Sequence, residues 1–189
     1  ERKIAVIFVT DVVGFSKSME KNEDETLRSF RSCRDILDNL FKEHGGRIFN
    51  TAGDSVLAEF QSAVSAVICA KEFQNLIRER NANVSEEAKM HFRIGLNMGD
   101  VIVEGENLYG EGVNVAARLE ALSQPDGVCL SKSILDFVNK KTELNFHDLG
   151  EQKVKNTTVH AFDLSNPELE QRTLNQQTQN EEEISKAPT

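Results

Sequence analysis

The apolar run at residues 3–10, KIAVIFVT, is the segment that most constrains the fold of this chain. It is rich in Val and Ile and too short for a helix, so it predicts a buried strand. Asp11 follows the run directly, and Gly14 lies three residues further on. A rigid buried strand would hold the Asp11 carboxylate in one place, as a functional site requires.

The remaining sequence predicts alternating helices and strands. Apolar residues at helical spacing predict helices over 15–44, 62–80, 113–123 and 131–139. Short apolar runs predict strands over 47–51, 55–60, 127–130, 146–150 and 159–164, of which the first two form a hairpin with a turn at 52–54. Residues 90–103 predict two strands with a turn near Gly99-Asp100.

This order of elements predicts an α+β fold with a ferredoxin-like βαββαβ core and a small C-terminal α/β annex. We expect a mostly antiparallel sheet with helices on one face, formed by residues 1–165 as one domain. Residues 166–189 lack aromatic residues and are rich in Gln, Asn and Glu, so they predict a disordered tail.

Composition narrows the classes of protein that fit. Hydrophobic residues make up 39% of the 189 residues and charged residues 28%, which is typical of a globular protein, and no apolar run is long enough for a membrane span. The net charge of −9, without a dense basic block, argues against nucleic acid as a partner. The three cysteines form no CxxC pair, which predicts buried free thiols in a reducing, cytoplasmic compartment. Residue 1 is not Met, so the sequence leaves undecided whether a sensor or membrane segment lies upstream.

Two carboxylates are predicted to meet at one end of the sheet. Asp11 ends the first strand and Asp54 lies in the hairpin turn, so pairing of these strands would bring them together. Adjacent carboxylates repel unless a cation separates them, and an oxygen-only site with few ligands suggests Mg²⁺ or Mn²⁺. Alternatively, Asp11 caps the next helix and Asp54 serves a tight turn. The occurrence of both on apolar strands favours metal binding.

Asn114 and Arg118, in the stretch GEGVNVAARLE, form a second candidate pair. They are four residues apart, so on a helix they point the same way, and the fork of an Arg suits a phosphate. An equally acceptable interpretation pairs Arg118 with Glu111 or Glu120 and makes Asn114 a helix cap. Lys155 is a third positive group, although a lone surface Lys is usually only solvated.

Five stretches, in this order, resemble the class III nucleotidyl cyclase catalytic domain, the adenylate/guanylate cyclase family. They are FVTDVVGFS, NTAGDSVLAEF, FRIGLNMGDVIV, YGEGVNVAARLEAL and LGEQKVKN, and the resemblance covers roughly residues 4–164. It implies a reaction in which a ribose 3′-oxygen attacks the α-phosphate of a nucleoside triphosphate and pyrophosphate leaves. Two divalent metal ions, Mg²⁺ or Mn²⁺, would lower the cost of forming the alkoxide and neutralise the triphosphate.

The resemblance also implies a role for each candidate residue. Asp11, Asp54 and the backbone carbonyl of Val12 would hold both metals. Asn114 would orient the ribose, and Arg118 would stabilise charge at the α-phosphate.

Three further residues and a partner follow from the same resemblance. Lys155 would contact the terminal phosphates, Gly14 would let the backbone approach the phosphates, and Phe15 would pack beneath it. The family implies a homodimer with shared active sites, in which one subunit supplies the two Asp residues and the other supplies the Asn and Arg.

The chain departs from the family at the positions that read the purine. Members that use ATP usually carry Lys four residues before the second metal Asp, and Asp or Thr seven residues before the ribose Asn; here Asn50 and Asn107 occupy these positions. An amide can donate and accept, so it discriminates poorly between adenine and guanine. We expect ATP to be favoured over GTP. A guanylate cyclase, a catalytically weak pseudo-cyclase that binds nucleotide, and an interaction module are the alternatives. A diguanylate cyclase is disfavoured because the hairpin reads AGDSV, not a GG[DE]EF-type turn.

Overall fold

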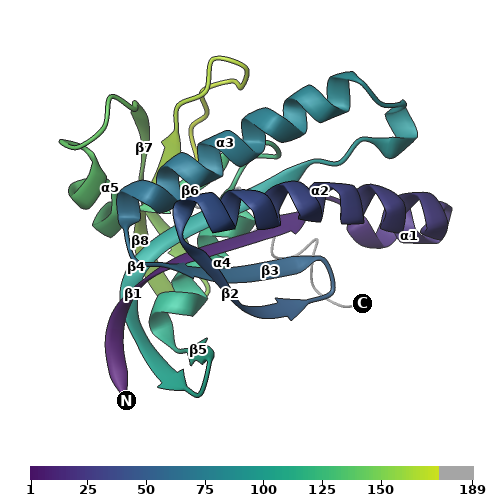
Figure 1. Cartoon of the computed structure of the whole chain (residues 1–189). Coiled ribbons are helices and arrows are strands. Elements are labelled where there is room, and N and C mark those ends of the chain that lie inside the picture. Colours follow the sequence, from purple (N-terminus) through teal and green to yellow (C-terminus); the bar gives the residue numbers. More distant parts are fainter. Residues whose placement is uncertain (175–189) are drawn as a thin grey trace.

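The computed structural model describes residues 1–174 and arranges them around one sheet (Figure 1). The strands are β1 (Arg2–Val12), β2 (Gly46–Ala52), β3 (Ser55–Phe60), β4 (Phe92–Glu104), β5 (Asn107–Tyr109), β6 (Val128–Ser131), β7 (Phe146–Val154) and β8 (Thr157–Leu164). Their order is β2-β3-β1-β4-β6-β8-β7, and β5 pairs with β4. Within residues 1–174, β4 and β6 pair in parallel and the other pairs are antiparallel, so the expected mostly antiparallel sheet is confirmed.

The helices follow the predicted apolar spacing. They are α1 (Phe15–Lys21), α2 (Glu23–His44), α3 (Ala63–Ala82), α4 (Glu111–Leu122) and α5 (Lys132–Val138), with a short 3₁₀ helix η1 (Glu86–Ala88). The side chain of Asn22 accepts a hydrogen bond at the start of α2, and that of Ser62 does so at the start of α3. The α+β class and the ferredoxin-like core are therefore confirmed.

Strand β1 is buried on both faces, which decides where the helices lie. Val6 and Phe8 point into the core formed with α2 and α3. Ala5, Ile7 and Val9 point to the other face, where they pack against α4. The prediction of helices on one face is therefore wrong. A strand that is apolar at successive positions needs a cover on each side of the sheet.

Strand β4 is continuous over 13 residues, so the predicted turn at Gly99-Asp100 is also wrong. Its pairing with β1 runs unbroken from Phe92 to Ile102. The glycine at position 99 allows a close approach of α4 and does not make a turn. A Cβ on Gly112, in the first turn of α4, would lie 2.8 Å from the carbonyl oxygen of Asp100.

A second close approach holds the middle of α4 on the sheet. A Cβ at Gly95 of β4 would collide with the backbone of Ala116 and Glu120. Gly95 and Gly99 are four residues apart and so lie on the same face of β4. Helix α4 consequently runs along β4, with its first turn at Gly99 and its third at Gly95.

Residues 166–174, which were predicted to be disordered, make contacts with the folded domain. Arg172 donates two hydrogen bonds to Asp163, at 2.8 and 3.0 Å, and Leu174 packs against an apolar cluster. Residues 175–189 of the expected tail lie outside the described residues. No helix within residues 1–174 has both the length and the apolar character needed to cross a membrane.

Candidate active site

Two carboxylates converge where β1 ends beside the β2–β3 turn. Asp11 is the penultimate residue of β1, and Asp54 lies in the turn after β2. The backbone N–H of Val12 donates a hydrogen bond of 2.8 Å to Oδ2 of Asp54. The Asp54 carboxylate is thus anchored to the residue that follows Asp11. Strand pairing brings together two residues that are 43 positions apart in the sequence.

The electrostatics of this pair favour a cation. Burial raises the pKa of Asp54, the backbone hydrogen bond from Val12 opposes that rise, and the charge of Asp11 adds to it. Neither carboxylate forms an ion pair within residues 1–174; Arg93, opposite Asp11 in the ladder, donates its Nε to the carbonyl of Ser123. Carboxylate and carbonyl oxygens are the ligands that Mg²⁺ and Mn²⁺ prefer, so Asp11, Asp54 and the carbonyl of Val12 form a donor set that could hold such ions.

The chain turns sharply just after this pair. Gly14 has a φ of 67°, a left-handed conformation that an L side chain adopts only with strain. Phe15 opens α1, and its ring packs against Phe30 with centroids 5.5 Å apart. The packing predicted for Phe15 is therefore observed, since its half-buried side chain packs against the apolar cluster formed with α2 and α3.

Asn114 and Arg118 share a face of α4, but each has a different environment. Asn114 is exposed and lies inside the helix, whose N-cap is Gly110, so its interpretation as a cap is wrong. Nη1 of Arg118 donates a 2.7 Å hydrogen bond to Oγ1 of Thr157 on β8 and lies 3.9 Å from a carboxylate oxygen of Glu111. Arg118 is therefore partly neutralised by groups of the same chain.

Lys155 lies on the same hairpin as the partner of Arg118. It is exposed in the two-residue turn between β7 and β8, with a φ of 54°, two positions before Thr157. A left-handed conformation at a residue other than Gly is uncommon. The turn thus carries one cation itself and holds another, Arg118, at its base.

One subunit does not bring the two candidate pairs together. Asp11 is on β1, and the guanidinium of Arg118 reaches β8, three strands away in the order β1-β4-β6-β8. At about 4.8 Å for each strand spacing, the separation across the sheet is about 14 Å. Asp54 lies on the opposite side of β1 from β8, so it is further still from Arg118.

The two purine-reading candidates lie on two elements that contact each other, β2 and β5. Asn50 is exposed on β2, beside an irregularity in the pairing with β3. Asn107 begins β5, where its amide nitrogen donates to the Tyr109 hydroxyl at 2.9 Å. Arg47 of β2 donates to the carbonyl of Glu106 at 2.7 Å, which joins the two elements.

Thr157 is a candidate site residue that sequence reasoning missed. It is 39 positions from Arg118, and no motif or spacing connects them. Glu111 was considered as an ion-pair partner of Arg118, and the structure places it there; Oγ1 of Thr157 also donates to Glu111, at 3.4 Å. Only the packing of the β7–β8 hairpin beside α4 brings these groups together.

Comparisons with known proteins agree with this fold. The family model for the adenylate and guanylate cyclase catalytic domain matches residues 1–166. A Rhizobium meliloti protein named "Putative adenylate cyclase 3" is 42% identical over 156 residues, which is 82% of this chain and 27% of that protein. An adenylate cyclase of Streptomyces coelicolor is 28% identical over 137 residues, covering 72% of this chain and 34% of that protein. The chain therefore spans about a quarter to a third of the length of these curated relatives.

A solved structure with 36% sequence identity to this chain has the same fold. It is described as an adenylate/guanylate cyclase/hydrolase from Silicibacter pomeroyi, and it superposes with a TM-score of 0.80 at 36% identity, covering 88% of this chain and 98% of that one. The adenylyl cyclase CyaB from P. aeruginosa, at 20% identity, supports the fold alone, with a TM-score of 0.75. Because the family model covers most of the chain, this protein belongs to the adenylate and guanylate cyclase catalytic domain family.

Proposed function

We propose that this chain converts ATP into 3′,5′-cyclic AMP and pyrophosphate, as a homodimer with two shared active sites. The observation that carries the proposal is the convergence of two carboxylates without a cationic partner: Asp54 is hydrogen-bonded to the backbone beside Asp11, and neither carboxylate is ion-paired within residues 1–174. Membership in the cyclase family adds the reaction class.

The reaction forms one P–O bond and breaks another. The ribose 3′-oxygen attacks the α-phosphorus, the bond from that phosphorus to the bridging oxygen breaks, and pyrophosphate leaves. Asp11, Asp54 and the Val12 carbonyl would hold two divalent ions, which supply Lewis-acid stabilisation of the 3′-alkoxide and of the triphosphate. The left-handed turn at Gly14 exposes backbone beside the phosphates, with Phe15 fixing the turn from below.

The remaining roles fall to Asn114 and Arg118 on α4 and to the β7–β8 turn. The exposed Asn114 orients the ribose through its amide. Arg118 stabilises the negative charge that grows on the α-phosphate, since its planar fork suits two phosphate oxygens. Lys155 contacts the terminal phosphates, from the turn that also positions Arg118 through Thr157.

The separation of the two pairs supports a shared site. Asp11 and Arg118 are separated by at least about 14 Å across the sheet of one subunit, which is too far for both to contact one α-phosphate. A second copy related by two-fold symmetry can present its α4 to the Asp11 end of the first. Three buried free cysteines fit a reducing compartment, which supports a cytoplasmic location for this domain.

GTP is the second candidate substrate, because of Asn50 and Asn107. Both amides offer a donor and an acceptor and so can pair with either purine edge. The free orientation of an exposed amide such as Asn50 favours weak discrimination. ATP is proposed first because the relatives named above include two adenylate cyclases.

The direct test is to incubate the purified chain with Mn²⁺ and either ATP or GTP and to measure cyclic product by chromatography. We expect cyclic AMP in excess of cyclic GMP, with activity lost on chelation. Cyclic GMP in excess would establish the second candidate. Nucleotide binding without either product, at high enzyme concentration, would replace the enzyme proposal by the pseudo-cyclase alternative.

Base selection is tested by restoring the residues typical of ATP-using members. The double variant Asn50→Lys with Asn107→Asp should raise the ratio of ATP to GTP turnover about tenfold, because a Lys donor and an Asp acceptor no longer present interchangeable groups. The matched control is Asn83→Asp, at the exposed end of α3. An unchanged ratio in the double variant would mean that these positions do not read the purine.

A further inference from the structure

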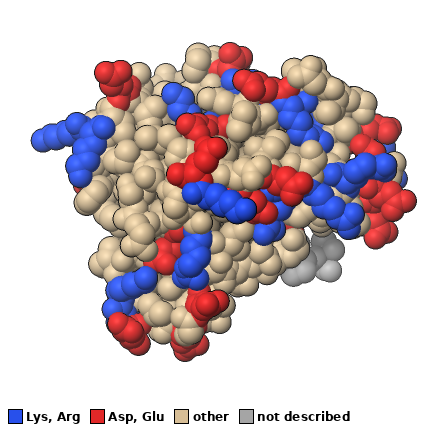
Figure 2. Space-filling model, viewed as in Figure 1, with Lys and Arg blue, Asp and Glu red and all other residues tan. Residues whose placement is uncertain are grey.

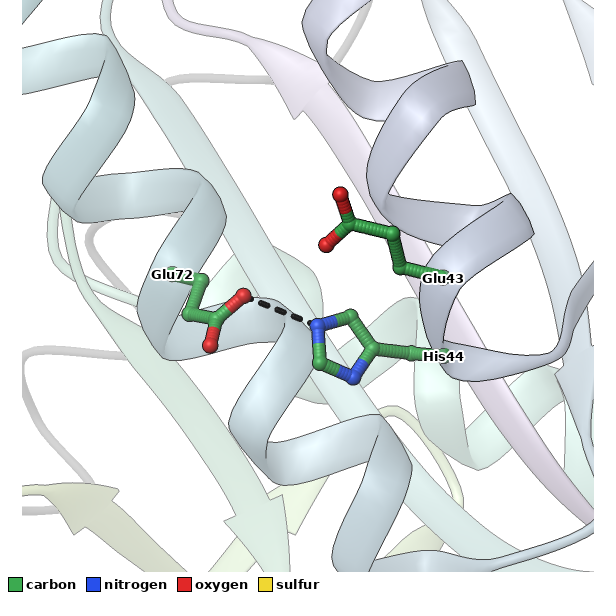
Figure 3. A group of neighbouring side chains, drawn as sticks. All are labelled: Glu43, His44 and Glu72. Carbon is green, nitrogen blue, oxygen red and sulfur yellow. Dashed lines mark hydrogen bonds and ion pairs between the residues drawn. The ribbon is translucent and has the colours of Figure 1, made fainter.

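A second cluster of metal-ligating side chains lies where the end of α2 meets α3. Glu43 and His44 are the last two residues of α2, and Glu72 faces them from the middle of α3 (Figure 3). One ligand atom from each of the three residues lies within 4.8 Å of the other two. Within residues 1–174, this is the one group of three His, Cys, Asp or Glu side chains that meets this criterion.

The geometry of the cluster suits a single ion. Nε2 of His44 lies 2.8 Å from Oε2 of Glu72, and Figure 3 shows the Glu43 carboxylate extending over the imidazole toward α3. The ligands of a tetrahedral Zn²⁺, with bonds of about 2.0–2.1 Å, are about 3.3 Å apart. The three atoms therefore reach coordinating positions through side-chain shifts of about 1–2 Å, without movement of either helix.

The two carboxylates of the cluster have only one imidazole as an ion-pair partner within residues 1–174, which favours the binding of a cation. Glu72 has only the His44 imidazole as an ion-pair partner, and Glu43 has none, within residues 1–174. The buried Cys69 lies one turn before Glu72 on α3. The pKa of its thiol is raised to about 12, mainly by burial and further by the negative charges of Glu72 and Glu43. Figure 2 shows acidic and basic side chains intermixed over this face of the molecule.

The other His–carboxylate pairs lack this convergence. His160 has two acidic neighbours, but Asp148 lies 2.7 Å from Nε2 and Glu151 lies 3.7 Å from Nδ1, on different nitrogens of the ring. One ion cannot bind both carboxylates and one ring nitrogen there. Within the described part of the chain, His91 has Asp126 as its one acidic partner. His160 is therefore a natural control for His44.

The cluster is separate from the proposed catalytic ions. His44 ends α2, Gly46 starts β2, and the Asp54 turn follows the far end of that strand. A strand of seven residues spans about 20 Å, so the cluster lies at the opposite end of the hairpin from Asp54.

We propose that Glu43, His44 and Glu72 form a divalent transition-metal site, with Zn²⁺ as the preferred ion, that cross-links α2 to α3. An imidazole with two carboxylates and an open position for water matches a three-ligand zinc site, and the imidazole selects against Mg²⁺ and Ca²⁺. Because the two helices cover the same face of the sheet, the bound ion would stabilise that layer.

The test uses the full chain with Asp11→Asn and Asp54→Asn, so that the catalytic carboxylates do not compete. Calorimetric titration with Zn²⁺ should give one ion per chain, and excess Mg²⁺ should not displace it. Zn²⁺ should also raise the melting temperature. Adding His44→Ala should weaken binding by at least about tenfold, since even loss of a residue that supports a metal ligand costs about 10–100-fold. Adding His160→Ala instead should leave the Zn²⁺ affinity and the Zn²⁺-induced rise in melting temperature unchanged.

No nucleotide enters these measurements, so their outcome is independent of the proposed cyclase activity. If, without metal, the His44→Ala chain has a lower melting temperature than the parent chain, Glu43→Gln and Glu72→Gln provide the same test while keeping the helix ends intact. Equal Zn²⁺ affinity in the His44 and His160 variants would overturn the proposal, as would a stoichiometry below one in the parent chain.

Discussion

The end of β1 and the outer face of α4 carry the two halves of the proposed chemistry, and they differ in how their charges are satisfied. At the end of β1, Asp11 and Asp54 are held close together with no ion-pair partner within residues 1–174. On α4, Arg118 is already bound by Thr157 and approached by Glu111. The carboxylates of the first region lack a cation, whereas the Arg118 cation of the second region already has partners.

Under the proposed mechanism, neither region would be sufficient alone. Like charges held together store unfavourable energy until a cation arrives, which is a common property of functional sites. Arg118 has local partners without substrate, and in the proposed mechanism it would exchange them for phosphate. The contrast between the two regions can be tested by substitutions at each of them and by mixing variants.

The largest effect is expected at the carboxylate end. Asp54→Ala should reduce cyclic product by at least about 10³-fold, because the proposed metal site loses a ligand that no neighbour can replace. Activity would be measured with Mn²⁺ and ATP. Asp35→Ala, which removes an exposed carboxylate from α2, is the control and should be fully active. Substantial turnover by the Asp54 variant would remove the end of β1 from the mechanism.

A complementation experiment asks whether the two regions act across a dimer. Asp54→Ala and Arg118→Ala chains should each be inactive, while an equal mixture should recover about a quarter of wild-type activity, because half the dimers are mixed and each has one intact site of two. Dimer formation in the mixture would be verified by analytical ultracentrifugation. Recovery of nothing, with mixed dimers present, would contradict the two-subunit assignment.

A smaller effect is expected when Arg118 loses the contact that positions it. Thr157→Val removes the hydroxyl at similar volume and should lower kcat about three- to tenfold with little change in KM, because a hydrogen bond to a charged group is lost. Thr157→Ser keeps the hydroxyl and should restore kcat. If Ser and Val variants behave alike, Thr157 has only a packing role.

The smallest effect is a pH-dependent change in stability. The folded pKa of Asp54 is raised, so the folded state binds its proton more readily than the unfolded state, and this contribution to stability is lost as the pH rises through the folded pKa. Asp54→Asn should therefore melt, without metal, at least as high as the wild type near pH 7, and the difference should shrink toward about pH 4. Asp35→Asn is the exposed control. A neutral-pH melting temperature well below the wild type would contradict this sign.

Part of the fold and site could be predicted because it is local. The AGDS turn of the β2–β3 hairpin, the apolar strand before Asp11 and the helical spacing of Asn114 and Arg118 are encoded by neighbouring residues. The turn predicted at Gly99 failed because a glycine that makes room for another backbone cannot be distinguished, in sequence, from a glycine that bends its own.

Local sequence patterns were enough to predict most of the helices and strands, the acidic residues at the strand ends and the family motifs, since each depends on side chains within a few positions of one another. The folded structure was needed to see that helices cover both faces of the sheet, that Arg118 donates a hydrogen bond to Thr157, and that His44 meets Glu72. Those contacts join residues 28 to 39 positions apart, and their geometry depends on how whole elements pack. Side-chain packing between helices and sheet is a property of the assembled core, so no local pattern in the chain specifies it.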